Sequence, residues 1–307
     1  MTIISSDTAA TINSSAVNET IIIVPDVTVD ALVVTHAGVS AINHGRINFG
    51  VAFFIAGGGG ELVNHEDGLI LDGVVLGSGV NVVNHGLIYN GFSQYGVQFQ
   101  GSNAGNVTNS GEIYGSNAGV LINSSITVGA SISNSGEIRS DNTGIWLSGS
   151  PGGAPVVVNS GTIIGRTNAI LAASGDRLYV INSGSLIGNV TATSASQPDL
   201  VINHGAISGN VSLGTGNDAY TGIGRVSGTV FGEDGADSLA GGTTTDRLDG
   251  GTGNDTLSGN AGNDVLVGGI NNDRLLGGVG VDNLTGGANN ISSSSTRSSM
   301  PRPTATP

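Results

Sequence analysis

Aspartate recurs every nine residues near the C-terminus of the chain, and a leucine stands two residues after each aspartate. The aspartates are Asp237, Asp246, Asp255, Asp264, Asp273 and Asp282, and the leucines are Leu239, Leu248, Leu257, Leu266, Leu275 and Leu284. The most regular copy, residues 250–258, reads Gly-Gly-Thr-Gly-Asn-Asp-Thr-Leu-Ser. Each copy thus combines a glycine-rich turn, a carboxylate and an apolar residue. Because calcium takes about six to eight oxygen ligands from carboxylates and carbonyls, the pattern indicates calcium binding.

The period of nine also predicts how the copies stack. A nine-residue repeat divides into a turn of about six residues and a strand of about three, so two repeats complete one flattened coil. Alternate copies then lie on the same edge, about 4.8 Å apart. The expected neighbours are Asp237 with Asp255, Asp255 with Asp273, Asp246 with Asp264, and Asp264 with Asp282. Some copies are imperfect, because Thr244 and Asn271 replace the fourth glycine and Asn260 replaces the second.

The expected calcium ligands are these carboxylates, together with backbone carbonyls of the turn glycines. An earlier copy at residues 214–220 adds a further aspartate. The predicted ligand set is Asp218, Gly235, Asp237, Asp246, Gly251, Gly253, Asp255, Gly262, Asp264, Gly269, Asp273, Gly278, Gly280 and Asp282. Without calcium, neighbouring carboxylates repel by about 3–4 kcal/mol at an effective dielectric of about 20. One buried leucine contributes only about 2 kcal/mol, so the array is predicted to fold only with calcium.

A second, longer repeat precedes the nonapeptides. The tripeptide Asn-(His/Ser)-Gly begins at Asn43, Asn84, Asn109, Asn134, Asn159, Asn182 and Asn203, and an expanded version occupies residues 64–68. Short runs with period two indicate strands, and frequent glycine interrupts helices. Repeats of about 20–25 residues therefore predict coils of a parallel β-helix. Asparagine and glycine are expected to supply left-handed turn geometry.

The predicted fold class is all-β, with a parallel β-helix solenoid continuing into a C-terminal calcium-binding parallel β-roll. We expect an N-terminal cap at residues 1–30 and a β-helix of about eight coils at 31–213. The β-roll is expected at residues 214–287. Residues 288–307 are rich in Ser, Pro, Thr and Asn, a composition that predicts a disordered tail.

The composition excludes several partners. The chain of 307 residues has nine arginines, no lysine, no cysteine and a formal net charge of −14. Nucleic acid and anionic membranes are bound through cationic side chains, so the expected partner is a cation and not a nucleic acid. No apolar run approaches the roughly 20 residues that span a bilayer, so membrane insertion is not expected. Residues 1–24 lack the basic region of a general secretory signal.

Residues 214–287 resemble the C-terminal arrays of RTX (haemolysin-type) calcium-binding proteins, which share this nonapeptide. The resemblance implies a β-roll that folds on Ca²⁺ after export by type I secretion, without a cleaved N-terminal signal. It also implies that the repeated aspartates and the glycine carbonyls of the same turns are the ligands. Residues 31–213 resemble the passenger β-helices of bacterial surface proteins. The two resemblances together imply an extracellular or cell-surface protein with a structural or adhesin-like role. Its candidate partners are host or matrix glycans, or further copies of the chain through self-association.

A polysaccharide-modifying enzyme of lyase or epimerase type is the alternative, because secreted alginate epimerases also join a β-helix to RTX repeats. Their Tyr-Gly-aromatic-Asp-Pro-His-Glu type motif has no match here. Sugar chemistry needs clustered acids, and residues 73–175 contain only Glu112, Glu137 and Asp141. The best catalytic candidate is the His65-Glu66-Asp67 turn with Asp72, which a bulged polar loop also explains. We therefore expect no enzymatic activity and assign no catalytic residue.

His44, His65 and His85 occupy one position on three successive coils, and His204 repeats it later. Imidazoles that lie about 4.8 Å apart are one way to coordinate a zinc ion. Serine takes the same position in other coils, at Ser110, Ser135, Ser160 and Ser183. An exposed turn position is therefore the favoured interpretation of the histidines.

Overall fold

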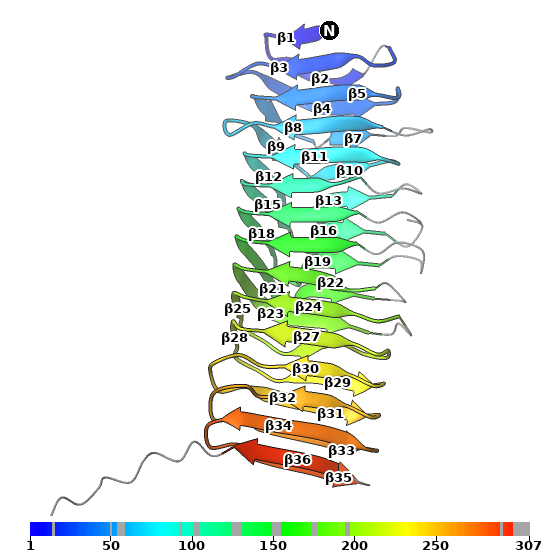
Figure 1. Cartoon of the computed structure of the whole chain (residues 1–307). Helices are drawn as coiled ribbons and strands as arrows, with labels where there is room; N and C mark the ends of the chain where they lie inside the picture. Colours follow the sequence, from blue (N-terminus) through cyan, green and yellow to red (C-terminus); the bar gives the residue numbers. More distant parts are fainter. Residues whose placement is uncertain are drawn as a thin grey trace, which may run out of the picture.

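The computed structural model describes residues 1–13, 16–49, 51–53, 59–92, 94–100, 105–123, 130–148, 155–173, 177–193, 197–288 and 291–296. Figure 1 shows these residues as one elongated stack of coils, from blue at the N-terminus to red at the C-terminus. The described elements are all strands, which form two sheets with parallel pairing. The predicted parallel β-solenoid is confirmed.

The first sheet contains 15 strands in chain order along the stack. They are β1 (Thr2–Ile4), β3 (Thr20–Ile23), β5 (Val39–Asn43), β8 (Gly60–Asn64), β11 (Val80–Asn84), β14 (Val107–Asn109), β17 (Ser131–Asn134), β20 (Val156–Asn159), β22 (Tyr179–Asn182), β24 (Leu200–Asn203), β27 (Ala219–Gly222), β30 (Ser238–Ala240), β32 (Thr256–Ser258), β34 (Asp273–Val279) and β36 (Ile291–Thr296).

The second sheet contains 21 strands, because many coils contribute two strands to it. They are β2 (Thr8–Asn13), β4 (Thr28–Val34), β6 (Arg46–Ile47), β7 (Val51–Phe53), β9 (Leu69–Leu71), β10 (Val74–Leu76), β12 (Leu87–Asn90), β13 (Tyr95–Phe99), β15 (Glu112–Gly115), β16 (Ala118–Ile122), β18 (Glu137–Ser140), β19 (Thr143–Leu147), β21 (Thr162–Ala172), β23 (Ser185–Ala192), β25 (Ala206–Ile207), β26 (Val211–Ser212), β28 (Arg225–Val226), β29 (Val230–Asp234), β31 (Arg247–Thr252), β33 (Val265–Ile270) and β35 (Asn283–Ala288).

The β-helix core is a set of apolar rows that run along the stack. Ile88, Ile113, Ile138 and Ile163 pair in register in the second sheet and are all 0% exposed. These are the aliphatic residues that follow the Asn-(His/Ser)-Gly tripeptides. Burial of a side chain of this size contributes about 1.5–3 kcal/mol, so the rows explain why the sequence repeats at this position.

The repeated asparagines form a buried hydrogen-bonded ladder, which the sequence did not predict. Asn109 Nδ2 donates to Asn134 Oδ1, and Asn134 Nδ2 donates to Asn159 Oδ1, each at 2.8 Å. The same bond links all eight, from Asn43 to Asn203. The expected left-handed geometry was wrong for these asparagines, because they are not among the described residues with positive φ. Their role is to satisfy buried polar groups between coils.

The glycines of the same tripeptides are required by close stacking. A methyl carbon added to Gly136 would collide with the carbonyl oxygen of Gly111, and Gly161 meets Gly136 in the same way. Like the asparagines, these glycines do not have a left-handed φ. The tripeptide is therefore a stacking motif between coils, in which the middle residue alone is free to vary.

The sheets continue without a break from the β-helix into the β-roll. Val201 of β24 pairs with Tyr220 of β27, and Tyr220 pairs with Leu239 of β30. From β30 onward each coil has two strands, and successive nonapeptides enter the two sheets alternately. Five of the six repeat leucines are at most 1% exposed, whereas Leu284 is partly buried.

The described strands at both ends of the chain pair with the strands of the stack. β1 and β3, within residues 1–30, already pair in register as coils of the stack. At the other end, β36 pairs with β34, and the backbone of Ile291 lies opposite Asp273. The backbone of residues 291–296, within the predicted tail, therefore adds one more strand to the sheet. Residues 289–290 and 297–307 make up most of the predicted tail, and they lie outside the described residues.

Candidate calcium site

The repeated aspartates form two columns, one along each sheet. The first aspartate column contains Asp199, Asp218, Asp237, Asp255 and Asp273, each immediately before or at the start of a strand of the first sheet. The second aspartate column contains Asp246, Asp264 and Asp282, each immediately before a strand of the second sheet. Seven of the eight are at most 6% exposed, and Asp282 is half-buried. The sequence-predicted neighbours are therefore neighbours in the structure.

Each carboxylate except that of Asp246 accepts a hydrogen bond from the backbone of the preceding coil. The N–H of Asp237 donates to Asp255 Oδ1 at 2.8 Å, and the N–H of Asp255 donates to Asp273 Oδ1 at 3.1 Å. In the second column, Asp264 Oδ1 and Asp282 Oδ1 accept the corresponding bonds at 2.9 and 3.1 Å. One oxygen of each of these carboxylates is thus fixed, which orients the other.

In most turns the second oxygen has no hydrogen-bond partner among the residues that the structure describes. Oδ2 is buried and unpartnered in Asp199, Asp218, Asp237, Asp255, Asp264, Asp273 and Asp282. Buried polar atoms are normally hydrogen-bonded, and an unpaired one is expensive. A row of carboxylate oxygens in this state fits a cation, because calcium is coordinated by oxygen.

The raised pKa values of the column aspartates also favour a cation site. Burial raises the pKa of Asp199 from 3.8 to about 7, and raises the pKa values of Asp237 and Asp255 to about 6. Burial disfavours the charged carboxylate, while the backbone hydrogen bond opposes the rise. The charges of Asp218 on Asp237, and of Asp273 on Asp255, raise the pKa further. Arg177 partly offsets the rise at Asp199, whereas no cation of the described residues contributes at Asp237 or Asp255.

Carbonyl oxygens approach the unpartnered carboxylate oxygens at the first glycine of each turn. A methyl carbon added to Gly250 would collide with Asp255 Oδ2 and would lie 2.6 Å from the carbonyl oxygen of Gly268. Gly259 borders Asp264 Oδ2 and the Gly277 carbonyl in the same way. This position is glycine in every copy from Gly232 to Gly277, so each turn keeps a space that a side chain would fill.

The second and fourth glycines of the turns have left-handed backbones. The predicted glycines Gly235, Gly253, Gly262 and Gly280 have φ values of 134–147°, and Gly251, Gly269 and Gly278 have φ values of 96–106°. Where glycine is replaced, Glu233, Asn260 and Asn271 still adopt positive φ, at 76°, 69° and 88°. At these left-handed positions, the carbonyls of successive turns lie in rows and close to the next glycine. A methyl carbon added to Gly253, for example, would collide with the carbonyl oxygen of Gly235.

The turn before Asp246 is different from the others. Gly242 and Thr244, its second and fourth residues, do not have positive φ. The N–H of Gly242 donates to Asp246 Oδ2 at 2.7 Å. This carboxylate oxygen is therefore already satisfied by its own turn, in contrast to Oδ2 of the other seven aspartates.

Two features of the aspartate turns were absent from the predicted ligand set. Asp199 lies in a Gln-Pro-Asp segment that lacks the turn glycines of the nonapeptide. Its distance of 19 residues from Asp218 is the only sequence feature that indicates its place in the column. The first glycines of the turns were visible as invariant members of the repeat. Glycines at positions one, two and four were expected to let carbonyls turn towards the ion, but the predicted ligand set did not include the first glycines.

The fold and these turns define a class: a parallel β-solenoid whose last coils carry a calcium-binding repeat array. The family model of the RTX calcium-binding nonapeptide repeat (4 copies) matches residues 228–257, 240–275 and 258–290. Residues 228–290 are therefore RTX nonapeptide repeats, and the ion that such repeats bind is Ca²⁺. Comparisons with curated proteins and with solved structures give no match. None of the described residues forms a helix that is long and apolar enough to cross a membrane.

Three acids of the β-helix, Glu112, Glu137 and Asp141, contact other side chains. Arg139 Nε lies 2.8 Å from Glu112 Oε1 and 3.4 Å from Glu137 Oε1. The hydroxyl of Tyr114 donates to Asp141 Oδ2 at 2.8 Å. The Arg139–Glu112 and Tyr114–Asp141 contacts join successive coils, and the Arg139–Glu137 contact lies within β18.

Proposed function

We propose that calcium ions bind between successive turns of the two aspartate columns and that they hold the β-roll together. The observation that supports this is the row of buried, unpartnered Oδ2 atoms in the stacked turns. The ligands are these oxygens, the carbonyls of the first glycines, and carbonyls from the left-handed positions of the turns. Six to eight oxygens of this kind meet the needs of calcium.

The same proposal includes the turn of Asp199, outside the residues matched by the family model. Asp199 is 1% exposed, its N–H donates to Asp218 Oδ1 at 2.7 Å, and its Oδ2 is unpartnered. Beside it, a cavity of about 410 Å³ is lined by Pro198, Thr215, Gly216, Asn217, Asp234 and Gly235. Calcium at this point would join the last β-helix coils to the first coil of the β-roll.

Calcium would then act as a folding switch. Buried carboxylates without a counter-ion disfavour the folded state, and an ion that binds only the folded state adds RT ln(1 + [L]/Kd) of stability. Extracellular calcium modules bind at about 10⁻⁴–10⁻³ M. With sites in that range, the β-roll would be folded outside a cell and destabilised in calcium-poor cytosol, which suits a protein that is exported before it folds.

The role that fits this architecture is a secreted or surface-bound structural or adhesin-like rod. Its long stack presents rows of Asn, Ser and Thr, and the only tryptophan, Trp146, is half-buried. The polysaccharide-modifying alternative lacks support in the β-helix, because Glu112 and Glu137 are ion-paired with Arg139. Glycans and further copies of the chain are the partners to test.

A calcium titration of the whole chain tests the proposal. Metal-free protein is titrated with Ca²⁺, and in parallel with Mg²⁺, while far-UV circular dichroism and calorimetry follow folding and binding. We expect several calcium equivalents and a gain of β signal at high micromolar to millimolar Ca²⁺, with little response to Mg²⁺. Absence of calcium-dependent heat and of any spectral or thermal-stability change would refute it.

Incubation of the calcium-loaded chain with acidic polysaccharides separates the two roles. The structural role predicts unchanged polymer length and uronate composition, with any effect limited to binding. Shortened chains, unsaturated ends or epimerised residues would show that the protein is an enzyme.

A further inference from the structure

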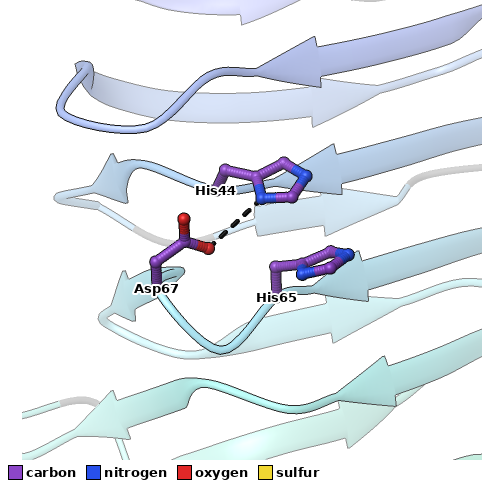
Figure 2. Close-up of side chains that lie close together, drawn as sticks. All are labelled: His44, His65 and Asp67. Carbon is purple, nitrogen blue, oxygen red and sulfur yellow. Dashed lines mark hydrogen bonds and ion pairs between the residues drawn. The ribbon is translucent and has the colours of Figure 1, made fainter.

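The expanded turn of the β-helix brings two histidines and an aspartate together at a distance from the aspartate columns. Residues 64–68 join β8 to β9 with three residues between Asn64 and Gly68, where the other turns of this type have one. The N–H of Gly68 donates to the carbonyl of His65 at 2.9 Å and closes the turn. The two extra residues carry Asp67 towards the preceding coil, where His44 lies (Figure 2).

The three side chains lie within coordination reach of one another. His44 Nδ1 is 3.2 Å from Asp67 Oδ1, and the rings of His44 and His65 stack with centroids 4.0 Å apart. One ligand atom from each of the three residues lies within 4.8 Å of the other two. A tetrahedral ion with ligands at about 2.0–2.2 Å needs ligand atoms roughly 3.3–3.5 Å apart. Small rotations of His65 and Asp67, both exposed, would close that gap.

The third histidine of the predicted ladder does not join this group. The His65 and His85 rings are 6.2 Å apart and tilted by 59°, and His85 Nδ1 lies 2.6 Å from Ser110 Oγ. The sequence-based idea of a three-histidine ladder is therefore replaced by a smaller group of two histidines and one carboxylate. His85 has the same position on the next coil, which makes it a natural control.

The surroundings leave room for an ion and its remaining ligands. A cavity of about 350 Å³ is lined by His44 and Asp67 together with Asp26, Thr28 and Arg46. Asp26 adds a second carboxylate to this cavity. Arg46 turns its Nε to Asn48 Oδ1 at 2.8 Å. Water from this cavity is available as a fourth ligand.

We propose that His44, His65 and Asp67 bind one divalent transition-metal ion, of which Zn²⁺ is the best fit. Two imidazoles and a carboxylate suit zinc, nickel and copper, whereas calcium takes oxygen ligands. The ion would link the coil of β5 to the coil of β8, independently of the calcium sites.

Zinc binding to the whole chain in saturating calcium tests the proposal, because the aspartate columns are then occupied. We expect one zinc equivalent by calorimetry and by metal analysis after dialysis. His44→Ala and Asp67→Ala should each weaken zinc binding at least tenfold, whereas His85→Ala should leave it unchanged. The far-UV spectrum of each variant verifies that it is folded.

Cobalt provides a second measurement that needs no variant. Co²⁺ bound by two imidazoles and a carboxylate should give visible absorption bands that zinc abolishes on displacement. The proposal is overturned if wild type binds no zinc equivalent above that of His44→Ala, if His85→Ala loses as much affinity, or if no zinc-displaceable Co²⁺ spectrum forms. Failure here would leave the calcium proposal untouched, since that proposal depends on other residues.

Discussion

The main-chain N–H of Asp237 donates to Oδ1 of Asp255, one coil further along the stack, at 2.8 Å. The bond fixes the rotation of the Asp255 carboxylate and leaves its buried Oδ2 without a partner. Because every aspartate of the first column makes the same bond, the protein presents oriented oxygens at regular intervals. The backbone thus pre-organises a row of ligands, which reduces the entropy lost when an ion binds.

Replacement of aspartates within a column and at its end should have unequal effects on calcium. Asp255 has a neighbour on both sides, Asp237 and Asp273, whereas Asp282 has only Asp264. We expect Asp255→Ala to weaken two sites and Asp282→Ala to weaken one. Loss of affinity by tenfold corresponds to about 1.4 kcal/mol per site. Calorimetric counting of calcium equivalents measures the difference, and equal losses in the two variants would contradict the stacking of sites between coils.

Asp246 should be the least important aspartate for calcium. Its Oδ2 already accepts the N–H of Gly242, and its turn lacks the left-handed residues of the others. Asp246→Asn should therefore change calcium affinity by less than about threefold, while Asp264→Asn, on the next coil of the same column, should reduce it about tenfold or more. Calcium titrations of the two variants, monitored by circular dichroism, provide the comparison. A larger effect at Asp246 would mean that calcium reorganises this turn.

Gly253→Ala should disrupt the turns through the backbone. Gly253 has a φ of 139°, and an added methyl carbon would collide with the carbonyl oxygen of Gly235. A strained backbone of this kind costs on the order of 1–3 kcal/mol, before the collision is counted. Thr256→Ala, on the following strand, should stay within about 0.5 kcal/mol of wild type. Urea unfolding in saturating calcium measures both, and a wild-type stability for Gly253→Ala would show that this turn is not closely stacked.

The sequence predicted the parts of this structure that repeat at short range. The period of nine gave the two columns and the buried leucines, because strand and turn lengths follow directly from the period. Asp199 was missed because its turn lacks glycine, and its place depends on a register set 19 residues away. The role of Asn134 was missed for the same reason, since its hydrogen bonds reach Asn109 and Asn159, each 25 residues distant. Contacts between coils could be predicted only where a strict period fixes the register, as it does for Asp237 and Asp255.

The asparagine ladder should contribute strongly to the stability of the β-helix. Asn134 Nδ2 donates to Asn159 Oδ1, and Asn134 Oδ1 accepts from Asn109 Nδ2. Asn134→Ala would leave both neighbours short of a partner in a buried site, at about 1–3 kcal/mol for each group. Asn142→Ala removes an exposed asparagine pair with Asn117 and should change stability by less than about 0.5 kcal/mol. Thermal unfolding in saturating calcium compares the two variants, and similar melting temperatures would show that the ladder is not a major source of stability.

Calcium-free protein should be more stable in mild acid than in mild base. The pKa values of Asp218, Asp237 and Asp255 are raised from 3.8 to about 6 in the folded chain, and that of Asp199 to about 7, mainly by burial. The folded state therefore retains protons that the unfolded chain has released. This contribution to stability is fully present below about pH 3.8 and is lost as the pH rises through 6 to 7.

Urea unfolding of metal-free protein at pH 5.5, 6.5 and 7.5 measures this effect, and the free energy of unfolding should fall at each step. Asp199→Asn removes the group with the highest of these pKa values, so its stability should fall less between pH 6.5 and 7.5. Saturating calcium should reverse the trend, because protons then compete with the ion for the same carboxylates. A metal-free stability that rises with pH would mean that these aspartates are solvated or paired in solution, and that the columns are not built to receive a cation.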